Sequence, residues 1–410
     1  MAHHLEYEDA LRLLLSRVPA PGGGLPVPLP EALGRVAAAD LFAPMDQPPF
    51  PRSPLDGYAF LSADTAGASP EAPAVLAVDG TRLAGDGNGD AVAPGHACRV
   101  MTGARLPEGT DCVVRQEDVT AEGTRVCVPR AYRAHENYVF PGEDVPKGRR
   151  LLSPGERITP AHIGVLAAQG LDRVSVYRTP VVGVLSTGSE LTAPGTPLAP
   201  GKIYDSNGYL LAASLTELGV CPRRLPAEPD RPELLQKSVS RLLNECDAVI
   251  TTGGVSVGQA DFMPSVAETL CGDVLFHGVN VKPGGPLLAT LVGGKPLLSL
   301  SGNPHAVMVT FALFGAPLVR RLSGLPDSVG DWEEAALAVD YRQASKTAPS
   351  RRFVRAELRC GQVRIPDSNR SPGALFGSIG CNCLVDMPAT GETLPAGQTV
   401  RVLPLGNRSW

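Results

Sequence analysis

The sequence predicts a multidomain α/β and β protein. A parallel α/β sheet domain accompanies a helical domain with an inserted β domain, and a further β domain ends the chain. The 410 residues are enough for two to three domains of about 150 residues each. Short β-like runs give way to β-branched strands that alternate with helices, and strands return near the end. The 45 glycines and 40 prolines are typical of many tight turns.

Helical signals stand on both sides of a β-rich segment in the first half of the chain. Apolar residues at helical spacing over 11–18 predict a first helix, and Pro30 is expected to begin a second one that runs to Val36. Thr159 and Pro160 are expected to cap and begin another helix. We therefore expect a discontinuous helical domain built from residues 1–40 and 143–178.

The segment between these halves predicts a compact β insert over residues 41–142. Short runs of β-forming residues are separated there by turns rich in glycine and aspartate. The runs cover residues 74–78, 98–101, 112–116 and 125–128.

Residues 179–326 predict the α/β domain, because β-branched strands alternate there with helices. We expect a parallel sheet, since helical crossovers connect parallel strands. The strands are expected over 181–185 and 248–252, and the helices over 205–218, 231–246 and 304–321. Residues 327–410 return to alternating strands and predict the terminal β domain, with strands over 336–341, 353–358, 384–387 and 399–403.

Composition and charge exclude several classes of function. The 37 basic and 42 acidic residues leave a net charge of -5, which disfavours nucleic acid and membrane surfaces as partners. The first residues carry several charges, unlike a signal peptide, so we expect a cytoplasmic protein. The nine cysteines form no C-x-x-C pair and the seven histidines have no metal-ligand spacing, so reduced thiols and no built-in zinc site are expected.

A glycine-rich loop follows the strand over 248–252. Thr252, Gly253, Gly254 and Ser256 belong to the run T-T-G-G-V-S-V-G. Glycines let backbone N–H groups approach an anion, and open α/β sheets bind ligands at the carboxyl ends of their strands. The loop therefore predicts a phosphate cradle; the alternative is a glycine-rich turn without a ligand.

Two companion loops follow other expected strands of the same sheet. One carries Ser186, Thr187 and Gly188, and the other carries Ser301, Gly302, Asn303 and Pro304. Glu190, Asp205 and Asp261 add carboxylates near the same edge, and such a set favours Mg²⁺ bridged to a phosphate. The alternative for each acid alone is a helix cap or a solvated side chain.

Further polar residues stand in short turn motifs. Lys282 lies in a rigid K-P-G-G-P turn and is a candidate anion ligand, although an isolated surface lysine is an equal alternative. Asp56, Thr102 and Asp144 stand in turns of the β insert and its exit, where ordinary turn chemistry is the alternative.

Taken together, the motifs resemble the molybdopterin molybdenumtransferase family, the MoeA and gephyrin E-domain proteins. The motifs, in the family's order, are S-P-L-D-G-Y-A, M-T-G-A, G-E-D-V, S-T-G-S-E-L, Y-D-S-N, T-T-G-G-V-S-V-G-x-x-D, K-P-G-G-P and S-G-N-P. The resemblance implies a MogA-like α/β domain and an elongated homodimer. It also implies the last step of molybdenum cofactor biosynthesis, in which adenylylated molybdopterin and molybdate give the cofactor and AMP with Mg²⁺ assistance.

The resemblance also implies roles for the candidate residues. The pterin phosphate and adenylate would be cradled by Ser186, Thr187, Gly188, Thr252, Gly253, Gly254 and Ser256. Glu190, Asp205 and Asp261 would hold the cation and orient the substrate. Asp56, Thr102 and Asp144 would reach the site from the partner subunit. Molybdate would meet Lys282 and the loop of Ser301, Gly302, Asn303 and Pro304.

The chain departs from the family pattern near the expected molybdate site. Gly278 and Gly285 stand where relatives often carry basic residues, and His305 replaces a small or hydroxylated residue. Oxyanion capture is therefore expected either to use Arg351 or Arg352 of the terminal domain or to be weaker, as in a diverged paralogue. The alternatives are a non-catalytic scaffold of the gephyrin type, a molybdopterin adenylyltransferase and a tungsten-preferring paralogue. Contacts with the adenylyltransferase and with apo-molybdoenzymes are further expected partners.

Overall fold

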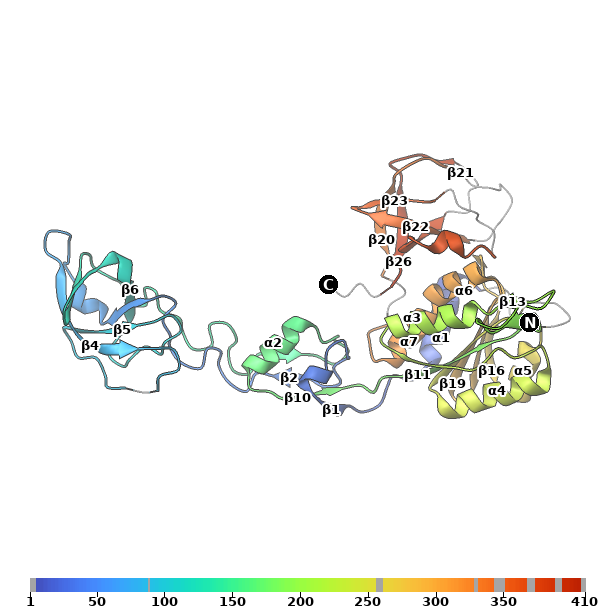
Figure 1. Cartoon of the computed structure of the whole chain (residues 1–410), viewed down its shortest axis with the longest axis horizontal. Coiled ribbons are helices and arrows are strands. Elements are labelled where there is room, and N and C mark those ends of the chain that lie inside the picture. Colours follow the sequence, from blue (N-terminus) through green and yellow to red (C-terminus); the bar gives the residue numbers. More distant parts are fainter. Residues whose placement is uncertain are drawn as a thin grey trace.

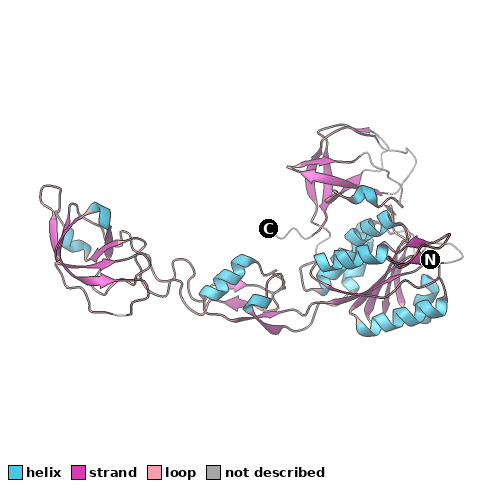
Figure 2. Cartoon of the chain, in the orientation of Figure 1, coloured by secondary structure: helices cyan, strands magenta, loops and turns pink. Residues whose placement is uncertain are grey.

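The computed structural model describes residues 5–87, 89–255, 261–327, 331–342, 351–366, 373–387 and 393–406. The chain is elongated (Figure 1): the β insert lies at one end, a small domain lies in the middle, and the α/β domain with the terminal β domain above it occupies the other end. Helices concentrate in the α/β domain, whereas the insert and the terminal domain combine strands and loops with short helical turns (Figure 2).

The α/β domain is organised around a six-stranded sheet in the order β14-β11-β15-β19-β18-β16. The strands are β11 (Val181–Ser186), β14 (Cys221–Arg224), β15 (Ala248–Thr252), β16 (Asp273–His277), β18 (Leu288–Val292) and β19 (Lys295–Leu300). The first four strands of that order are parallel, as expected. The prediction of a wholly parallel sheet is wrong for β18, which runs against the other five strands and pairs antiparallel with β19 and with β16, because the Gly293-Gly294 turn folds β18 and β19 into a hairpin.

Helices cover both faces of this sheet. One face packs against α3 (Asn207–Glu217) and the helical run over 304–322, and the other against α4 (Pro232–Glu245) and α5 (Met263–Thr269). Alternate strand residues supply the two cores, with Val184 facing the first and Leu185 the second.

The first helix, α1 (Tyr7–Arg17), belongs to the α/β core and not to the helical domain in which residues 1–40 were expected. Its apolar stripe is fully buried there, and the Tyr7 ring packs edge-on against Phe314 with centroids 5.6 Å apart. The stripe alone predicts a helix that buries one face, but not which partner receives it.

The helical run begins with α6 (Pro304–Thr310), passes through a π-helical turn over Phe311–Gly315 and ends with α7 (Ala316–Leu322). Among the described residues, this is the one helix long and apolar enough to span a membrane. Because 67% of that stretch is buried inside the protein, its apolar character is that of a core helix.

The middle domain is a small core with one helix, α2 (Pro160–Ala168). Thr159 caps this helix as predicted, and its side chain exchanges hydrogen bonds with His162. The predicted second helix from Pro30 to Val36 is wrong, since only the 3-10 turn Leu29–Glu31 forms. The domain's strands are β1 (Leu25–Pro28), β10 (Arg173–Val176), β2 (Leu41–Phe42) and β9 (Arg150–Leu152), which form two antiparallel pairs.

The insert forms a six-stranded sheet in the order β6-β3-β5-β4-β8-β7. The four predicted runs correspond to β4 (Ala74–Arg82), β5 (His96–Val100), β6 (Cys112–Arg115) and β8 (Arg125–Val128), and the sheet also contains two strands that were not predicted, β3 (Gly57–Phe60) and β7 (Thr120–Glu122).

The terminal domain is joined to the α/β domain by strand pairing. Its sheet has the order β17-β22-β23-β20-β26-β24, and β17 (Val281–Lys282) comes from the α/β domain. The other strands are β20 (Glu333–Leu337), β22 (Arg351–Arg359), β23 (Gln362–Arg364), β24 (Cys383–Met387) and β26 (Thr399–Pro404). The single strand predicted over 336–341 is replaced by β20 and the short β21 (Tyr341–Arg342), which pairs with β25 (Thr393–Leu394).

Candidate functional site

Three polar loops meet at the carboxyl edge of the α/β sheet. They follow β11, β15 and β19, which are neighbours in the sheet and run parallel. Ser186 stands opposite Thr252 in the ladder, and Thr252 stands opposite Leu300, so all three loops leave the sheet at the same level. The convergence predicted from the sequence is confirmed.

Hydrogen bonds tie these loops to one another. The Thr187 N–H donates to the carbonyl of Thr252 at 2.8 Å, and the Gly253 N–H donates to that of Leu300 at 3.0 Å. The Thr252 hydroxyl donates to the carbonyl of Ser301 at 3.0 Å. These bonds hold the three strand ends as one polar rim.

Asn207, which sequence reasoning left unassigned, bridges two of the loops. Its Nδ2 lies 3.0 Å from the hydroxyl of Thr252 and 2.8 Å from the carbonyl of Gly302. Its Oδ1 is buried without a hydrogen-bond partner among the described residues. The Y-D-S-N motif is the signal that points to it.

Glycine is required at the centre of the rim. Gly253 has φ +96°, and a Cβ atom there would overlap the Thr187 carbonyl and lie 2.7 Å from its Oγ1. Gly302 lies beside it, since a Cβ on Gly302 would stand in ordinary van der Waals contact, 3.5 Å from the Cα of Gly253. Gly302 and Asn303 are exposed, so the rim is open. Ser256, the remaining predicted cradle residue, lies outside the described residues.

Asp205 is the buried acid of the rim, with 3% of its surface exposed. Its Oδ1 accepts hydrogen bonds from the Ser186 hydroxyl at 2.8 Å and from the Gly208 N–H at 2.9 Å. The second bond caps the first turn of α3, so the capping alternative also holds. Its Oδ2 is buried, has no hydrogen-bond partner among the residues that the structure describes, and lies 3.6 Å from Nη1 of Arg224.

The other two predicted metal ligands occupy different positions along the same edge. Glu190 is exposed and folds back over Gly188, where a Cβ would lie 2.7 Å from its carboxylate oxygens. Asp261 is half-buried just before α5. Over the described chain, no three His, Cys, Asp or Glu side chains gather to hold a metal ion.

The expected centre of Glu190, Asp205 and Asp261 is therefore not preassembled, because hydrogen bonds within the fold direct the Asp205 carboxylate. The rim offers side-chain oxygen atoms as ligands to a cation. The Oγ1 of Thr187, Oδ1 of Asn207 and Oδ2 of Asp205 are all buried without a hydrogen-bond partner in the described part of the chain. Hard cations such as Mg²⁺ take oxygen ligands of this kind and commonly complete their shell with water and phosphate oxygens.

The turn that carries Lys282 packs against α6, the helix that follows the third loop. A Cβ on Gly284 would overlap the Thr310 side chain and lie 3.5 Å from the Ala306 carbonyl, so the turn touches α6 at Ala306 and Thr310. Lys282 itself is exposed, and it pairs in the ladder with Arg352. Lys282 and Arg352 thus remain candidate anion ligands where the two domains meet.

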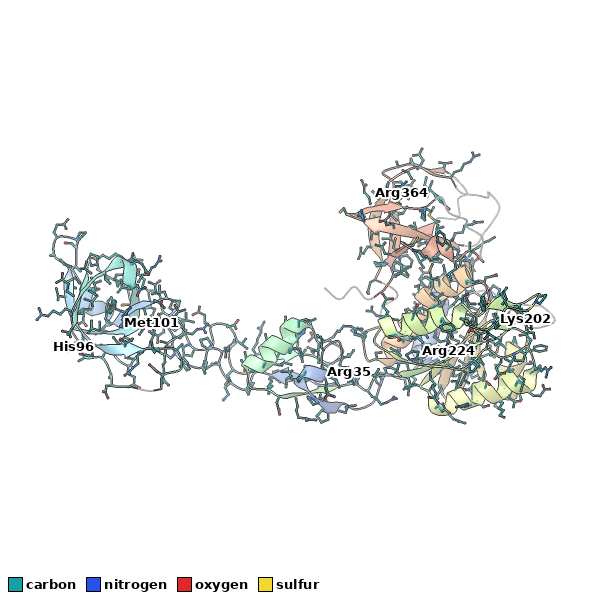
Figure 3. The ribbon with its side chains drawn as sticks, in the orientation of Figure 1. Arg35, His96, Met101, Lys202, Arg224 and Arg364 are labelled. Atoms are coloured by element: carbon teal, nitrogen blue, oxygen red, sulfur yellow. The ribbon has the colours of Figure 1, made fainter. Side chains whose placement is uncertain are left out.

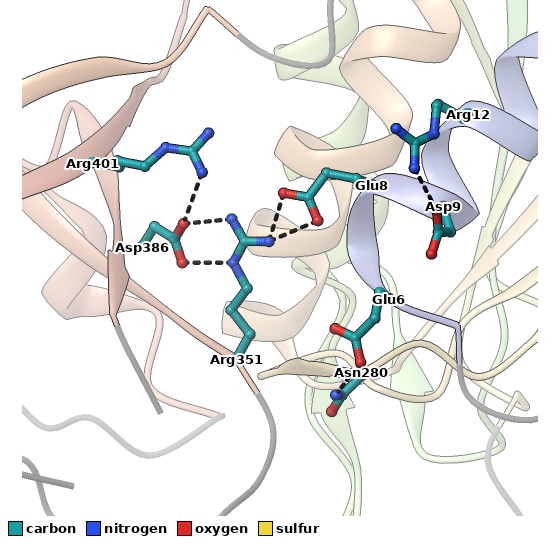
Figure 4. Close-up of polar contacts among 8 residues, drawn as sticks. All are labelled: Glu6, Glu8, Asp9, Arg12, Asn280, Arg351, Asp386 and Arg401. Carbon is teal, nitrogen blue, oxygen red and sulfur yellow. Dashed lines mark hydrogen bonds and ion pairs between the residues drawn. The ribbon is translucent and has the colours of Figure 1, made fainter. Parts of the chain in front are cut away.

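The expectation that Arg351 captures an oxyanion is wrong, because two carboxylates already engage its guanidinium. Its Nε lies 2.8 Å from Asp386, and its Nη1 lies 2.6 Å from Glu8 on α1 (Figure 4). Hydrogen bonding with Asp386 raises the pKa of Arg351. The arginine therefore fastens the first helix to the terminal domain.

His305, the departure noted in the sequence, is buried at the start of α6. The residue is 6% exposed, and neither ring nitrogen has a hydrogen-bond partner within the described ranges. Burial, with a smaller contribution from the charge of Arg355, lowers the pKa of His305 to about 4.

The free energy of unfolding is therefore expected to decrease as the pH is lowered, because of the lowered pKa of His305. Below pH 6.5 this histidine takes up a proton in the unfolded state, whereas in the folded state it does so only near pH 4. The difference lowers the free energy of unfolding by about 2 kcal/mol at pH 5. His305→Leu should flatten the fall in unfolding free energy between pH 7.5 and 5, measured by denaturant titration. His135→Leu, at an exposed position, is the control; equal slopes for the wild type and His305→Leu would contradict the assignment.

Asp56, Thr102 and Asp144 lie in or beside the insert. One Asp56 oxygen accepts from both the N–H and the hydroxyl of Thr102, each at 2.7 Å. The backbone hydrogen bond from Thr102, followed by the one from its side chain, lowers the pKa of Asp56. Asp144 is exposed beside the linker, and its N–H donates to the Gln47 carbonyl at 3.0 Å.

The fold of one chain does not bring these three residues to the rim. Figure 3 labels Met101, the residue before Thr102, at the far end of the molecule from Arg224, which lies in the α/β domain. A site that uses both groups needs a second copy of the chain.

Two family models match the chain. Residues 5–170 match "MoeA N-terminal region (domain I and II)", and residues 183–321 match "Probable molybdopterin binding domain".

Curated relatives and solved structures match over nearly the whole length. A molybdopterin molybdenumtransferase of Staphylococcus epidermidis is 34% identical over 92% of this chain and 90% of its own. One from Bacillus subtilis is 36% identical over 92% and 89%. The crystal structure of a molybdopterin biosynthesis MoeA protein from Pyrococcus horikoshii has a TM-score of 0.85 and 32% identity, and covers 99% of this chain and 100% of that one.

Proposed function

Because this chain belongs to the molybdopterin molybdenumtransferase family, we propose that it transfers molybdenum from molybdate to adenylylated molybdopterin and releases AMP. The observation that carries the proposal is the rim of three strand-end loops, which are held together by hydrogen bonds and open to solvent. Such a rim offers free amides and hydroxyls to a phosphate beside a buried carboxylate.

The loops of Ser186–Gly188 and Thr252–Gly254 bind the phosphate and adenylate parts of the substrate in this proposal. Their glycines allow close backbone approach. Asp205 and Asn207 orient the bound group, since both are fixed by hydrogen bonds on one side and have, on the other, an oxygen that accepts no hydrogen bond from the described residues.

Magnesium fits this rim as an ion shared with the substrate. Asp205, together with Glu190 or Asp261, would hold it while phosphate oxygens complete its shell. When bound, it would neutralise the negative charge of the phosphoanhydride that is cleaved. The protein's own part is to hold the acids and to keep the phosphate on the loop amides.

Lys282 and the loop of Ser301, Gly302, Asn303 and Pro304 are the proposed contacts of molybdate. The loop leads into α6, and the turn that carries Lys282 contacts α6 and pairs through β17 with β22 of the terminal domain. Arg352 adds the positive charge that Gly278 and Gly285 do not supply.

A homodimer with shared sites accounts for Asp56, Thr102 and Asp144, which lie far from the rim of their own chain. A groove of about 460 Å³ between α3, the 304–322 helical run and the end of β26 offers a partly apolar surface for the second copy, lined by Leu210, Met308, Phe311 and Pro317 and by charged residues that include Glu217 and Arg320. We place this dimer in the cytoplasm, in contact with the adenylyltransferase that makes its substrate and the apo-molybdoenzymes that take its product.

The test is incubation of the purified protein with adenylylated molybdopterin, Mg²⁺ and either molybdate or tungstate. AMP release together with reconstitution of an apo-molybdoenzyme supports the transferase. AMP release alone indicates a hydrolase, and neither indicates a scaffold of the gephyrin type. A larger yield with tungstate identifies a tungsten-preferring enzyme.

Asp261→Asn is expected to reduce Mg²⁺-dependent AMP release by roughly 10- to 100-fold, in line with the loss of one group that supports a metal site. The dimer should remain intact in gel filtration. Asp273→Asn is the control, since that exposed acid pairs with Arg17 away from the rim. Unchanged turnover of Asp261→Asn would remove this acid from the mechanism.

A further inference from the structure

Arg224 is the cation that lies beside the buried carboxylate of the rim. It is the last residue of β14, the edge strand next to β11, and so it leaves the sheet at the same edge as the three loops. Its Nη1 lies 3.6 Å from Oδ2 of Asp205. Among the described residues, this is the ion pair that Asp205 makes.

The arginine is held in place by an aromatic ring. Its guanidinium carbon lies 4.0 Å from the centroid of Tyr209, which stands on the first turn of α3. A cation over an aromatic face at this distance gains about 0.5 to 2 kcal/mol. The guanidinium thus has its own support and does not depend on Asp205 for its position.

The pair is electrostatic and leaves the oxygen's hydrogen-bonding capacity unused. A separation of 3.6 Å is longer than a hydrogen bond. Oδ2 is buried and accepts no hydrogen bond from the described part of the chain, whereas Oδ1 accepts two. A buried carboxylate oxygen without a donor is costly, which indicates an atom that is completed by a ligand.

We propose that Arg224 is a positioning residue that acts as the exchangeable counter-ion of Asp205. Arg224 neutralises the carboxylate in the free enzyme. A divalent cation that binds to Oδ2 then displaces the guanidinium. This inference rests on the proposed function only in assigning Asp205 to the cation. Because two positive groups beside one oxygen repel each other, arginine and cation compete.

The competition is testable with Mn²⁺ alone, measured by electron paramagnetic resonance on the full-length protein without any pterin. Arg224→Met should bind Mn²⁺ about tenfold more tightly than the wild type, which corresponds to about 1.4 kcal/mol. It should also gain more thermal stability from Mn²⁺, because its buried carboxylate otherwise lacks a partner. Arg223→Met is the matched control, since Arg223 lies on the same strand but pairs with Glu245 at 3.0 Å.

Tyr209→Leu covers the case in which Arg224→Met does not fold. It keeps both charges and removes only the ring that fixes the guanidinium, so Mn²⁺ binding should tighten two- to threefold, whereas Tyr209→Phe should match the wild type. Equal or weaker Mn²⁺ binding by the folded variants, or no binding by any of them, overturns the inference. If the proposed transferase function is wrong, the wild type releases no AMP, but the differences in Mn²⁺ affinity among the variants remain as predicted.

Discussion

Two inactive variants of this chain are expected to recover activity when they are combined in one dimer. Asp56→Ala removes an acid of the insert, and Asp205→Asn removes the buried acid of the rim. If each site joins the rim of one subunit to the insert of the other, a mixed dimer has one site with both mutations and one with neither. Purified mixed dimers should then release AMP at about half the wild-type rate, although each parent is nearly inactive.

The control for this experiment is the pair Asp56→Ala and Asp144→Ala. Both residues come from the same side of the proposed shared site, so every site of their mixed dimer lacks one acid and activity stays low. Differently tagged subunits, co-expressed and purified in two affinity steps, give the mixed dimers. Folded Asp56→Ala and Asp205→Asn dimers that stay inactive together would exclude a shared site.

Gly253→Ala is expected to abolish substrate binding at the rim. The new Cβ would meet the Thr187 carbonyl while the backbone sits at φ +96°, so the loops after β11 and β15 must move apart. The hydrogen bonds that align both loops with the third would be lost with that movement. We expect kcat/KM for AMP release to fall by at least about 100-fold, as is typical when positioned donors are lost.

Gly195→Ala separates the effect of backbone strain from the effect of the steric clash with the Thr187 carbonyl. Gly195 also has a positive φ, +85°, but nothing lies within 4 Å of the position of its Cβ. This variant should lose about 1 kcal/mol of stability from backbone strain and retain its kinetics. If both variants lose AMP release equally, backbone strain explains the effect and displacement of the rim loops does not.

Local patterns in the sequence were sufficient to predict the pieces from which the site is built. Thr159 followed by Pro160 predicts the start of a helix, since capping and a fixed φ are properties of neighbouring residues. The T-T-G-G run after a buried β-branched strand predicts a tight polar loop for the same reason. Once three such loops follow parallel strands, their meeting at one edge is a consequence of strand direction, and the structure confirms it.

Contacts between distant segments were beyond such reasoning. The hydrogen bond from Asn207 to Gly302 spans 95 residues, and that from Arg351 to Glu8 spans 343. The apolar stripe of α1 predicts a buried face, but the α/β core that covers it is settled by which surfaces fit together.

Composition, turns, caps and the order of motifs therefore follow from the chain itself, because they depend on the chemistry of adjacent residues. The engagement of Arg351 by Glu8, the orphaned oxygen of Asp205 beside Arg224 and the distance of Asp56 from the rim follow only from the packed molecule. These contacts form because segments far apart in the sequence pack against the same apolar cores, and no short stretch of sequence determines that packing.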